Sequence, residues 1–289
     1  MDFEEQLEKM QAANELKWSF LPQQKKFNLV PPHQDLLDNL PPGAYEFGMS
    51  MFGPFADIVD LKQEELISFD EGPGKLVMEE VDRFWDLKER YAKLGVPYRR
   101  GIMMHGPPGT GKSGVVRLVC NDVIEKGGLV AIVKHAETFS NFIPLLNRSD
   151  PNKRLVVVLE DVDNLVNYDE HEFLQLLDGL ADDRPQMLFL ATTNFIQHIP
   201  ARIYRPSRFD LLVEVGLPCA MVRHGYVEQL CQRFGAEFNQ QFVDLSEGLS
   251  FAHLKELIVS HLLFERSVEE IVERLKKHGD LGTDDEDDE

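Results

Sequence analysis

The residues from 106 to 113 could bind the phosphate groups of a nucleotide. They read Gly106-Pro107-Pro108-Gly109-Thr110-Gly111-Lys112-Ser113 and lie between an apolar run and a helix-forming stretch. The glycines allow successive backbone N–H groups to turn toward phosphate oxygens, and the dipole of the following helix adds positive charge. Lys112 is expected to reach the β and γ phosphates, and the Ser113 hydroxyl is expected to ligate Mg²⁺. The motif therefore predicts a site for a nucleoside triphosphate with Mg²⁺.

A pair of carboxylates follows further along the chain. The apolar residues 155–159 predict a buried parallel strand, and Glu160 and Asp161 come directly after it. Ligands of such sheets bind beyond the carboxyl ends of the strands. A strand that merely ends in a polar loop is a common pattern by itself. Together with the phosphate-binding loop, however, the pair is better interpreted as the groups that serve Mg²⁺ and the attacking water.

Two more segments complete a family pattern. A third apolar run leads into Asn194, and residues 199–210 contain Arg205 and Arg208 in the sequence Ile-Pro-Ala-Arg-Ile-Tyr-Arg-Pro-Ser-Arg-Phe-Asp. With the first two motifs, this resembles the AAA ATPases. The resemblance implies ATP hydrolysis, with Asn194 holding the attacking water and the two arginines acting as fingers on ATP bound by a neighbouring subunit. It therefore implies a homo-oligomeric ring, a hexamer or a heptamer.

Residues 95–101 and 159–163 are similar to the subfamily of the mitochondrial Rieske-protein translocase and its soluble bacterial and viral relatives. Most AAA proteins have Asp before Glu at the second motif, whereas here Glu160 precedes Asp161. The resemblance thus implies that Asp161 is the general base and that Glu160 supports Mg²⁺ through its water shell. Because the base is one methylene shorter, we expect slow hydrolysis or a need for a tighter subunit interface.

The alternation of strands and helices predicts an α/β fold, a parallel sheet with helices on both faces, followed by a small all-α lid. The expected strands are 102–104, 129–133, 155–159, 187–191 and 211–215, and the expected entry helix is 76–94. We expect four parts: a loop-rich N-terminal segment at 1–60, the AAA ATPase core at 61–216, the helical lid at 217–278 and an acidic, disordered tail at 279–289.

The N-terminal segment and the lid carry further signals. A helix is expected at 3–16, and paired prolines then predict loops. The Phe/Met-rich run 47–55 is better interpreted as a strap that seals the core or the ring interface than as a contact for client or adenine. In the lid, Ser250 is the expected N-cap of a helix that passes the nucleotide, and Phe251 replaces the family's usual glycine. A capping box is expected at Ser267.

Composition limits the partners. The chain has 289 residues, a net charge of −20 and a pI near 4.8, which disfavours broad contact with nucleic acid. The three cysteines lack metal or redox spacing and are interpreted as reduced, mostly buried thiols. No metal other than Mg²⁺ is expected. Without an apolar run of membrane-spanning length, the chain is expected to be soluble and cytoplasmic, with no membrane span.

The function that these observations favour is an oligomeric, chaperone-like AAA ATPase that couples hydrolysis of ATP to the remodelling or translocation of a protein client. Residues 130–142 contain Phe139 and Phe142 but lack the aromatic–apolar–glycine triplet of peptide-threading relatives. One alternative is an assembly switch, in which ATP closes a ring and slow hydrolysis resets it. A DNA-acting motor is a weaker alternative because of the acidic charge.

Overall fold

The computed structural model describes residues 17–21, 25–30, 39–50, 53–61, 72–178 and 186–280. The strands in these ranges are β1 (Lys17–Leu21), β2 (Lys26–Val30), β3 (Gly43–Ser50), β4 (Gly53–Ile58), β5 (Arg99–His105), β6 (Leu129–Ile132), β7 (Leu155–Leu159), β8 (Met187–Thr193) and β9 (Leu211–Glu214). The helices are α2 (Pro73–Trp85), α3 (Lys88–Leu94), α4 (Lys112–Glu125), α5 (Ala136–Ser149), α6 (Val162–Tyr168), α7 (Glu170–Asp178), the 3₁₀ turn η2 (Ile196–His198), α8 (Ala220–Phe234), α9 (Gln241–Asp244), α10 (Phe251–Phe264) and α11 (Val268–Asp280).

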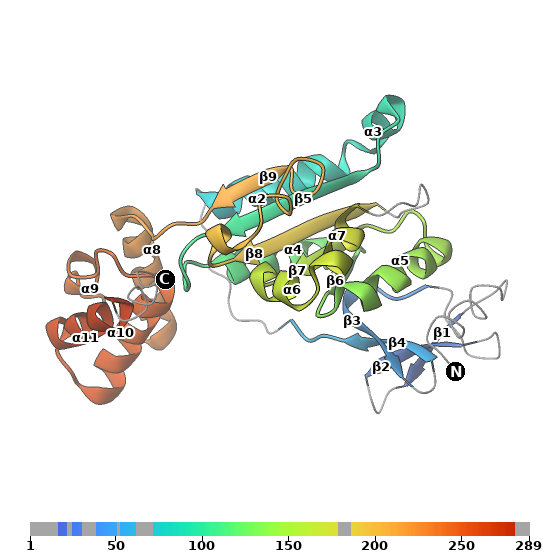
Figure 1. Ribbon diagram of the computed structural model, residues 1–289. Coiled ribbons are helices and arrows are strands. Elements are labelled where there is room, and N and C mark those ends of the chain that lie inside the picture. Colours follow the sequence, from blue (N-terminus) through green and yellow to red (C-terminus); the bar gives the residue numbers. More distant parts are fainter. Residues whose placement is uncertain are drawn as a thin grey trace.

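The described strands form one sheet in the order β1-β2-β4-β3-β6-β7-β8-β5-β9. The six strands from β3 to β9 in this order pair in parallel, whereas β1, β2 and β4 pair antiparallel. Helices cover both faces of the parallel part (Figure 1). The predicted α/β fold with a helical C-terminal region is therefore confirmed.

Alternate residues of the central strands serve two hydrophobic cores. In β7, Leu155, Val157 and Leu159 belong to the core that α5, α6 and α7 complete. Val156 and Val158 point to the other face and join the core that α2 and α4 complete. Because strand side chains alternate between faces, an unbroken apolar run marks a strand buried on both sides.

The entry helix differs from the expectation. Instead of one helix over 76–94, α2 ends at Trp85 and α3 begins at Lys88. Val77, Val81 and Phe84 are buried as expected, but Leu94 is 75% exposed. The predicted stripe is wrong at this end because α3 leaves the sheet, as Figure 1 shows, so its last turn has no core to cover.

The N-terminal segment contains strands where we expected loops. β3 pairs in parallel with β6 and antiparallel with β4, so the parallel sheet itself supplies backbone partners that the sequence does not reveal. Phe47 in β3 is buried against Phe139 and Phe142 of α5, with ring centroids 5.5 and 5.2 Å away. These contacts agree with the strap interpretation for Phe47. The expected helix at 3–16, the end of the acidic tail and residues 51–52 lie outside the described residues.

The C-terminal helices α8 to α11 pack around a hydrophobic cluster of their own. As predicted, Ser250 caps α10, where its Oγ accepts a hydrogen bond from the His253 backbone N–H at 3.4 Å. Ser267 likewise accepts from the Glu270 backbone N–H at 3.2 Å at the start of α11. Within the described ranges, no helix has the length and apolar character needed to cross a membrane.

Truncation of Phe47 tests the role of the strap. Phe47→Ala removes a buried ring from the core beneath α5, so we expect a loss of about 3–5 kcal/mol in the free energy of unfolding, measured by denaturant titration. Met49→Ser on the same strand is the control, because Met49 is only half-buried and should cost clearly less. Equal effects of the two substitutions would contradict a sealing role for Phe47.

Candidate functional site

The phosphate-binding loop connects the carboxyl end of β5 to the first residue of α4. Gly106 has φ 142°, and a Cβ there would collide with the carbonyl oxygen of Val215. Gly109 has φ 74°, and its Cβ would lie 2.7 Å from Ser250 Oγ. Only glycine combines these backbone angles with such close neighbours. The glycines therefore allow the loop to touch both the end of β9 and the start of α10.

Lys112 folds back over this loop. Its Nζ donates hydrogen bonds to the carbonyl oxygens of Gly106 at 2.6 Å and Pro107 at 2.8 Å, and the residue is 7% exposed. Burial lowers the pKa of Lys112, and the negative charge of Asp161 partly opposes that shift. Desolvation disfavours a buried ammonium, so a phosphate oxygen beside it would be a strongly favoured partner. Ser113, the next residue, is exposed at the start of α4.

The two carboxylates at the end of β7 have different positions. Asp161 lines the cavity beside the loop, whereas Glu160 is exposed and is not among the described residues of that wall. Asp161 has a left-handed backbone, φ 50° and ψ 59°, and its backbone N–H donates to Thr192 Oγ1 at 3.3 Å. An asparagine or aspartate tolerates this backbone better than other side chains. Asp161 caps α6 without a side-chain hydrogen bond, so its carboxylate stays available to the cavity.

Asn194 reaches the same cavity from the neighbouring strand. It follows β8 directly and is half-buried. Thr193 before it donates its hydroxyl to Asp163 Oδ1 at 2.9 Å and accepts the Phe195 backbone N–H at 3.1 Å. This network joins the end of β8 to α6. The structure thus brings Lys112, Asp161 and Asn194 to one cavity.

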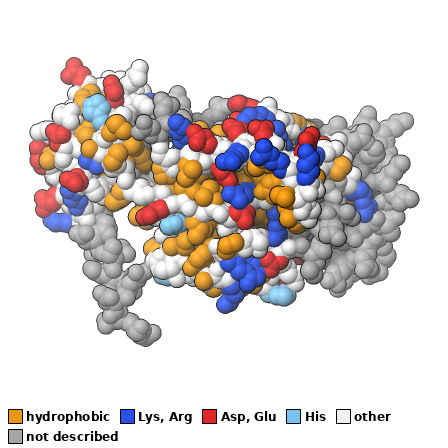
Figure 2. All heavy atoms as spheres, turned by 90° about the horizontal axis from the view of Figure 1, so that it is seen from above, with side chains coloured by type: hydrophobic (Ala, Val, Ile, Leu, Met, Phe, Trp, Pro, Cys, Tyr) orange, Lys and Arg blue, Asp and Glu red, His pale blue; other side chains and the backbone are white. Residues whose placement is uncertain are grey.

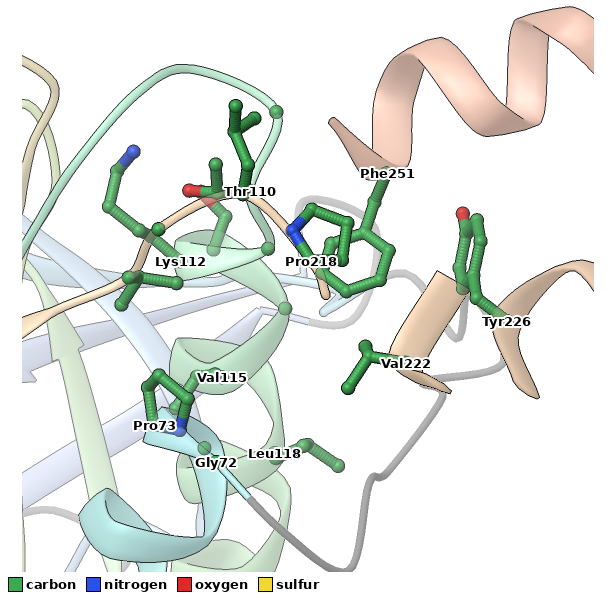
Figure 3. A pocket seen from close by; sticks show the side chains of 18 of the residues that line it. Gly72, Pro73, Thr110, Lys112, Val115, Leu118, Pro218, Val222, Tyr226 and Phe251 are labelled. Atoms are coloured by element: carbon green, nitrogen blue, oxygen red, sulfur yellow. The ribbon is translucent and has the colours of Figure 1, made fainter. Parts of the chain in front are cut away.

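The cavity has a volume of about 1120 Å³ and lies between the core and the lid. Its basic lining residues are Lys75, Lys112, Arg117, Arg233 and Lys255, against one acidic residue, Asp161. Its apolar lining residues include Pro73, Val115, Leu118, Pro218, Val222, Tyr226 and Phe251 (Figure 3). A net-acidic chain therefore concentrates positive charge in one cavity that also offers an apolar surface. Such a combination suits a polyphosphate with a flat aromatic group.

The two residues predicted to be arginine fingers, Arg205 and Arg208, lie away from the cavity. Neither Arg205 nor Arg208 is among the described residues that line the cavity. Arg205 is exposed, but Arg208 is 6% exposed and its guanidinium grips both carboxylate oxygens of Asp178 at the end of α7. Arg208 also donates to the Arg202 carbonyl oxygen. In this structure Arg208 therefore holds residues 199–210 to α7, and Arg205 is exposed. This segment is called the finger loop below, after the role predicted for its arginines.

The finger loop is fixed at its other end as well. Asp210 accepts the backbone N–H of Gly101 and that of Ser207 on its two carboxylate oxygens, both at 3.1 Å. Arg99 of β5 donates to the Ser207 carbonyl oxygen at 2.7 Å and to the Leu177 carbonyl oxygen. These bonds connect β5, α7 and the loop, so the position of Arg205 is set by the core.

Several cavity residues escaped the sequence analysis. Thr192, which orients the backbone of Asp161, could have been found from its place at the end of a buried strand. The apolar walls from α8 and the linker before it gave no such signal, because lid packing decides where Val222 and Tyr226 point. Residues 72–75 at the start of α2 also line the cavity, and only the Gly72-Pro73-Gly74 sequence hinted at a turn there.

Comparison with known proteins agrees with this geometry. The family model described as "ATPase family associated with various cellular activities (AAA)" matches residues 102–217. The human mitochondrial chaperone BCS1 is 30% identical over 181 residues, which cover 57% of this chain and 42% of that protein. The probable mitochondrial chaperone BCS1-B of Dictyostelium discoideum is 24% identical over 229 residues, covering 64% of this chain and 48% of the relative. The chain thus spans less than half the length of these relatives.

Among solved structures, the crystal structure of the FIGL-1 AAA domain in complex with ADP is similar, with a TM-score of 0.53 and 21% sequence identity. The match covers 70% of this chain and 72% of that chain. At this identity the likeness shows the fold alone.

The pair of Arg208 and Asp178 predicts a pH dependence of stability. The hydrogen bond from Arg208 holds the pKa of Asp178 below its usual value. The pair therefore stabilises the fold above the unfolded-state pKa of about 3.9, and this stabilisation is lost as the pH falls through the lower folded-state pKa. We expect Asp178→Asn to cost about 1–3 kcal/mol near neutral pH, because Arg208 loses its charged partner, and less below about pH 4.

The measurement is the free energy of unfolding of both proteins between pH 3 and pH 7. Glu273→Gln is the control, because this carboxylate pairs with Lys277 on an exposed helix face and should contribute little. A cost for Asp178→Asn that is the same at every pH would contradict the ion pair.

Proposed function

Because the chain carries an AAA ATPase domain and resembles the BCS1-type chaperones, we propose that it binds and hydrolyses ATP with Mg²⁺ in a ring of subunits that works on a protein client. One observation carries the proposal: the described cavity, which is lined by five basic side chains, also presents Lys112, Asp161 and Asn194. Lys112 begins α4 after the phosphate-binding loop, and Asp161 and Asn194 follow β7 and β8.

Phosphate binding would replace the hydrogen bonds that Lys112 now donates to the phosphate-binding loop. The two carbonyl oxygens that accept from Lys112 Nζ are weaker partners for an ammonium than a phosphate oxygen, because a charge-assisted hydrogen bond is about twice as strong. Lys112 would then turn from the loop to the β and γ phosphates. The loop glycines and the α4 N-terminus would supply N–H donors to the same groups.

Mg²⁺ fits the available donors. Ser113 and the carboxylates after β7 offer hard oxygen atoms, which this ion prefers. Among the described residues, no three His, Cys, Asp or Glu side chains are grouped to hold a metal by themselves. The ion would therefore arrive with the nucleotide, with Ser113 as a ligand and Glu160 acting through water, and it would neutralise charge on the phosphates.

Hydrolysis requires a water molecule in line with the γ phosphate. Asp161 would accept a proton from this water as the oxygen attacks phosphorus, while the bond to the β-phosphate oxygen breaks and ADP leaves with the electron pair. Asn194 would orient the water from the end of β8. Asp161 lines the cavity and makes no capping hydrogen bond with its side chain, so its carboxylate would be available for this role.

Negative charge on the transferred phosphoryl group would be stabilised from the neighbouring subunit. Arg205 and Arg208 lie outside the cavity of their own chain, which supports action in trans. Arg205 is exposed and can act without rearrangement, whereas Arg208 would first have to leave Asp178. We therefore assign the finger role primarily to Arg205 and assign Arg208 to the support of its loop.

The client is proposed to be a protein rather than nucleic acid. On the described face in Figure 2, basic side chains are interspersed with acidic and hydrophobic ones and form no broad basic field. Phe139 and Phe142 are buried in α5, so these aromatic residues cannot grip an extended peptide. Other surfaces would therefore contact the client. The two relatives are named chaperones, which favours a protein client.

The rate of ATP hydrolysis per subunit, measured against protein concentration, tests the proposal. The rate should rise steeply with concentration, and Lys112→Ala provides the blank. Arg205→Ala should retain ATP binding but lose turnover by roughly 10³-fold. Arg90→Ala, an exposed arginine on α3, is the matched control and should behave like the wild type.

Mixing the inactive variants sharpens this test. Lys112→Ala subunits retain Arg205, and Arg205→Ala subunits retain the nucleotide site, so mixtures should recover part of the activity if the finger acts in trans. A flat rate at the level of the blank, with ATP-dependent assembly, would favour the nucleotide-dependent switch instead. Wild-type protein that binds no ATP would overturn both functions.

The reversed order of the two carboxylates gives a second prediction. Asp161→Asn preserves the shape and the left-handed backbone, so ATP binding should persist while the hydrolysis rate falls by roughly 10²-fold or more. Glu160→Gln should instead raise the Mg²⁺ concentration needed for half-maximal rate. Full activity in Asp161→Asn with an inactive Glu160→Gln would show that the roles are exchanged.

A further inference from the structure

We propose that Phe251 is a specificity-determining residue whose ring stacks on the base of the bound nucleotide. The inference rests on the proposed function, since it concerns the same cavity, and it names the part of the ligand that the lid recognises. In this proposal the lid contacts the base, while the phosphate-binding loop and α4 bind the phosphates.

The first argument is the position of Phe251 relative to the phosphate-binding loop. It is the first residue of α10, directly after the N-cap Ser250. The neighbouring Ala252 backbone N–H donates to the Gly109 carbonyl oxygen at 3.3 Å, so the start of α10 is bound to the loop. A Cβ on Gly111 would lie 3.5 and 3.6 Å from two ring atoms of Phe251. The ring therefore stands opposite Gly111, with space for about a methyl group between it and the phosphate-binding loop.

The second argument is the aromatic pair that Phe251 forms with Tyr226 of α8. Their ring centroids are 4.8 Å apart at an interplanar angle of 61°. Edge-to-face packing of this kind fixes the orientation of a ring. Both residues line the cavity and both are half-buried, so part of the pair remains open to a ligand.

The third argument is the apolar surface around this pair. Val115 and Leu118 lie on α4, and Pro218 and Val222 come from the linker and α8 (Figure 3). Figure 3 places α4 on one side of the cavity and Phe251 with Tyr226 on the other. A flat base extending from phosphates held at Lys112 would enter between these walls. Aromatic stacking is tolerant of hydrogen-bonding pattern but increases with ring area, so purines should bind more tightly than pyrimidines.

Binding measurements on the full chain test the role of the ring. We would compare wild type, Phe251→Ala and Phe251→Leu by calorimetry with ATP, CTP and inorganic tripolyphosphate, each with Mg²⁺. Loss of one stacking partner should weaken ATP binding by roughly 5- to 150-fold in Phe251→Ala. Tripolyphosphate affinity should be unchanged, the preference for ATP over CTP should narrow, and Phe251→Leu should be intermediate. Phe264→Ala at the exposed end of α10 is the control and should match the wild type.

The alternative outcomes are distinct. Tighter ATP binding by Phe251→Ala would show that the ring obstructs the base, and it would overturn the inference. Equal weakening of ATP and tripolyphosphate would also overturn it, because the ring would then support only the loop. If the wild type binds ATP and Phe251→Ala binds it equally well, the inference fails while the proposed function stands. If the wild type binds no ATP, the proposed function fails first.

Discussion

Parallel pairing of β5 with β8 on one side and β9 on the other is the constraint on which the site depends. His105, the last residue of β5, is in register with Thr193 and Glu214. The loop that begins at Gly106 therefore starts beside Asn194 and beside the linker to the lid. β7 follows as the next neighbour of β8 and places Asp161 at the same edge. A shift of one residue would exchange the two faces of a strand, so the two-sided cores protect this register.

The lid has a hydrophobic cluster separate from the two cores of the sheet. Its described contacts with the phosphate-binding loop include the hydrogen bond from Ala252 to Gly109 and the approach of Phe251 to Gly111. Units with separate cores and a small interface are free to move relative to each other. A ligand between them adds contacts to both sides. Occupancy of the cavity is thus the natural means by which nucleotide chemistry could change the position of the lid.

The sequence predicted those features that are encoded locally. The loop glycines, the apolar run of β7 and the cap at Ser250 each identify their element, and the structure has all three. Prediction from the sequence failed where a residue or strand depends on a contact far away along the chain. β3 becomes a strand because β6 pairs with it, although prolines and glycines surround it. Arg208 meets Asp178 across 30 residues of chain, and no local pattern marks that pair. The walls of the cavity from α8 depend on lid packing in the same way.

The finger loop shows how contacts within one chain can fix a surface loop. Its bonds to β5 and α7 use Arg99, Arg208 and Asp210 within the subunit, so the loop keeps its shape before any partner arrives. The entropic cost of ordering the finger loop therefore falls on the folding of the chain. The proposed contact between subunits would not have to offset this cost again. Arg205 keeps its charge at the surface of this loop, whereas the likewise exposed Arg202 pairs with Glu170. The proposed contact between two copies would require a fixed loop with an exposed guanidinium and a cavity that its own finger loop does not reach, and the described residues have both features.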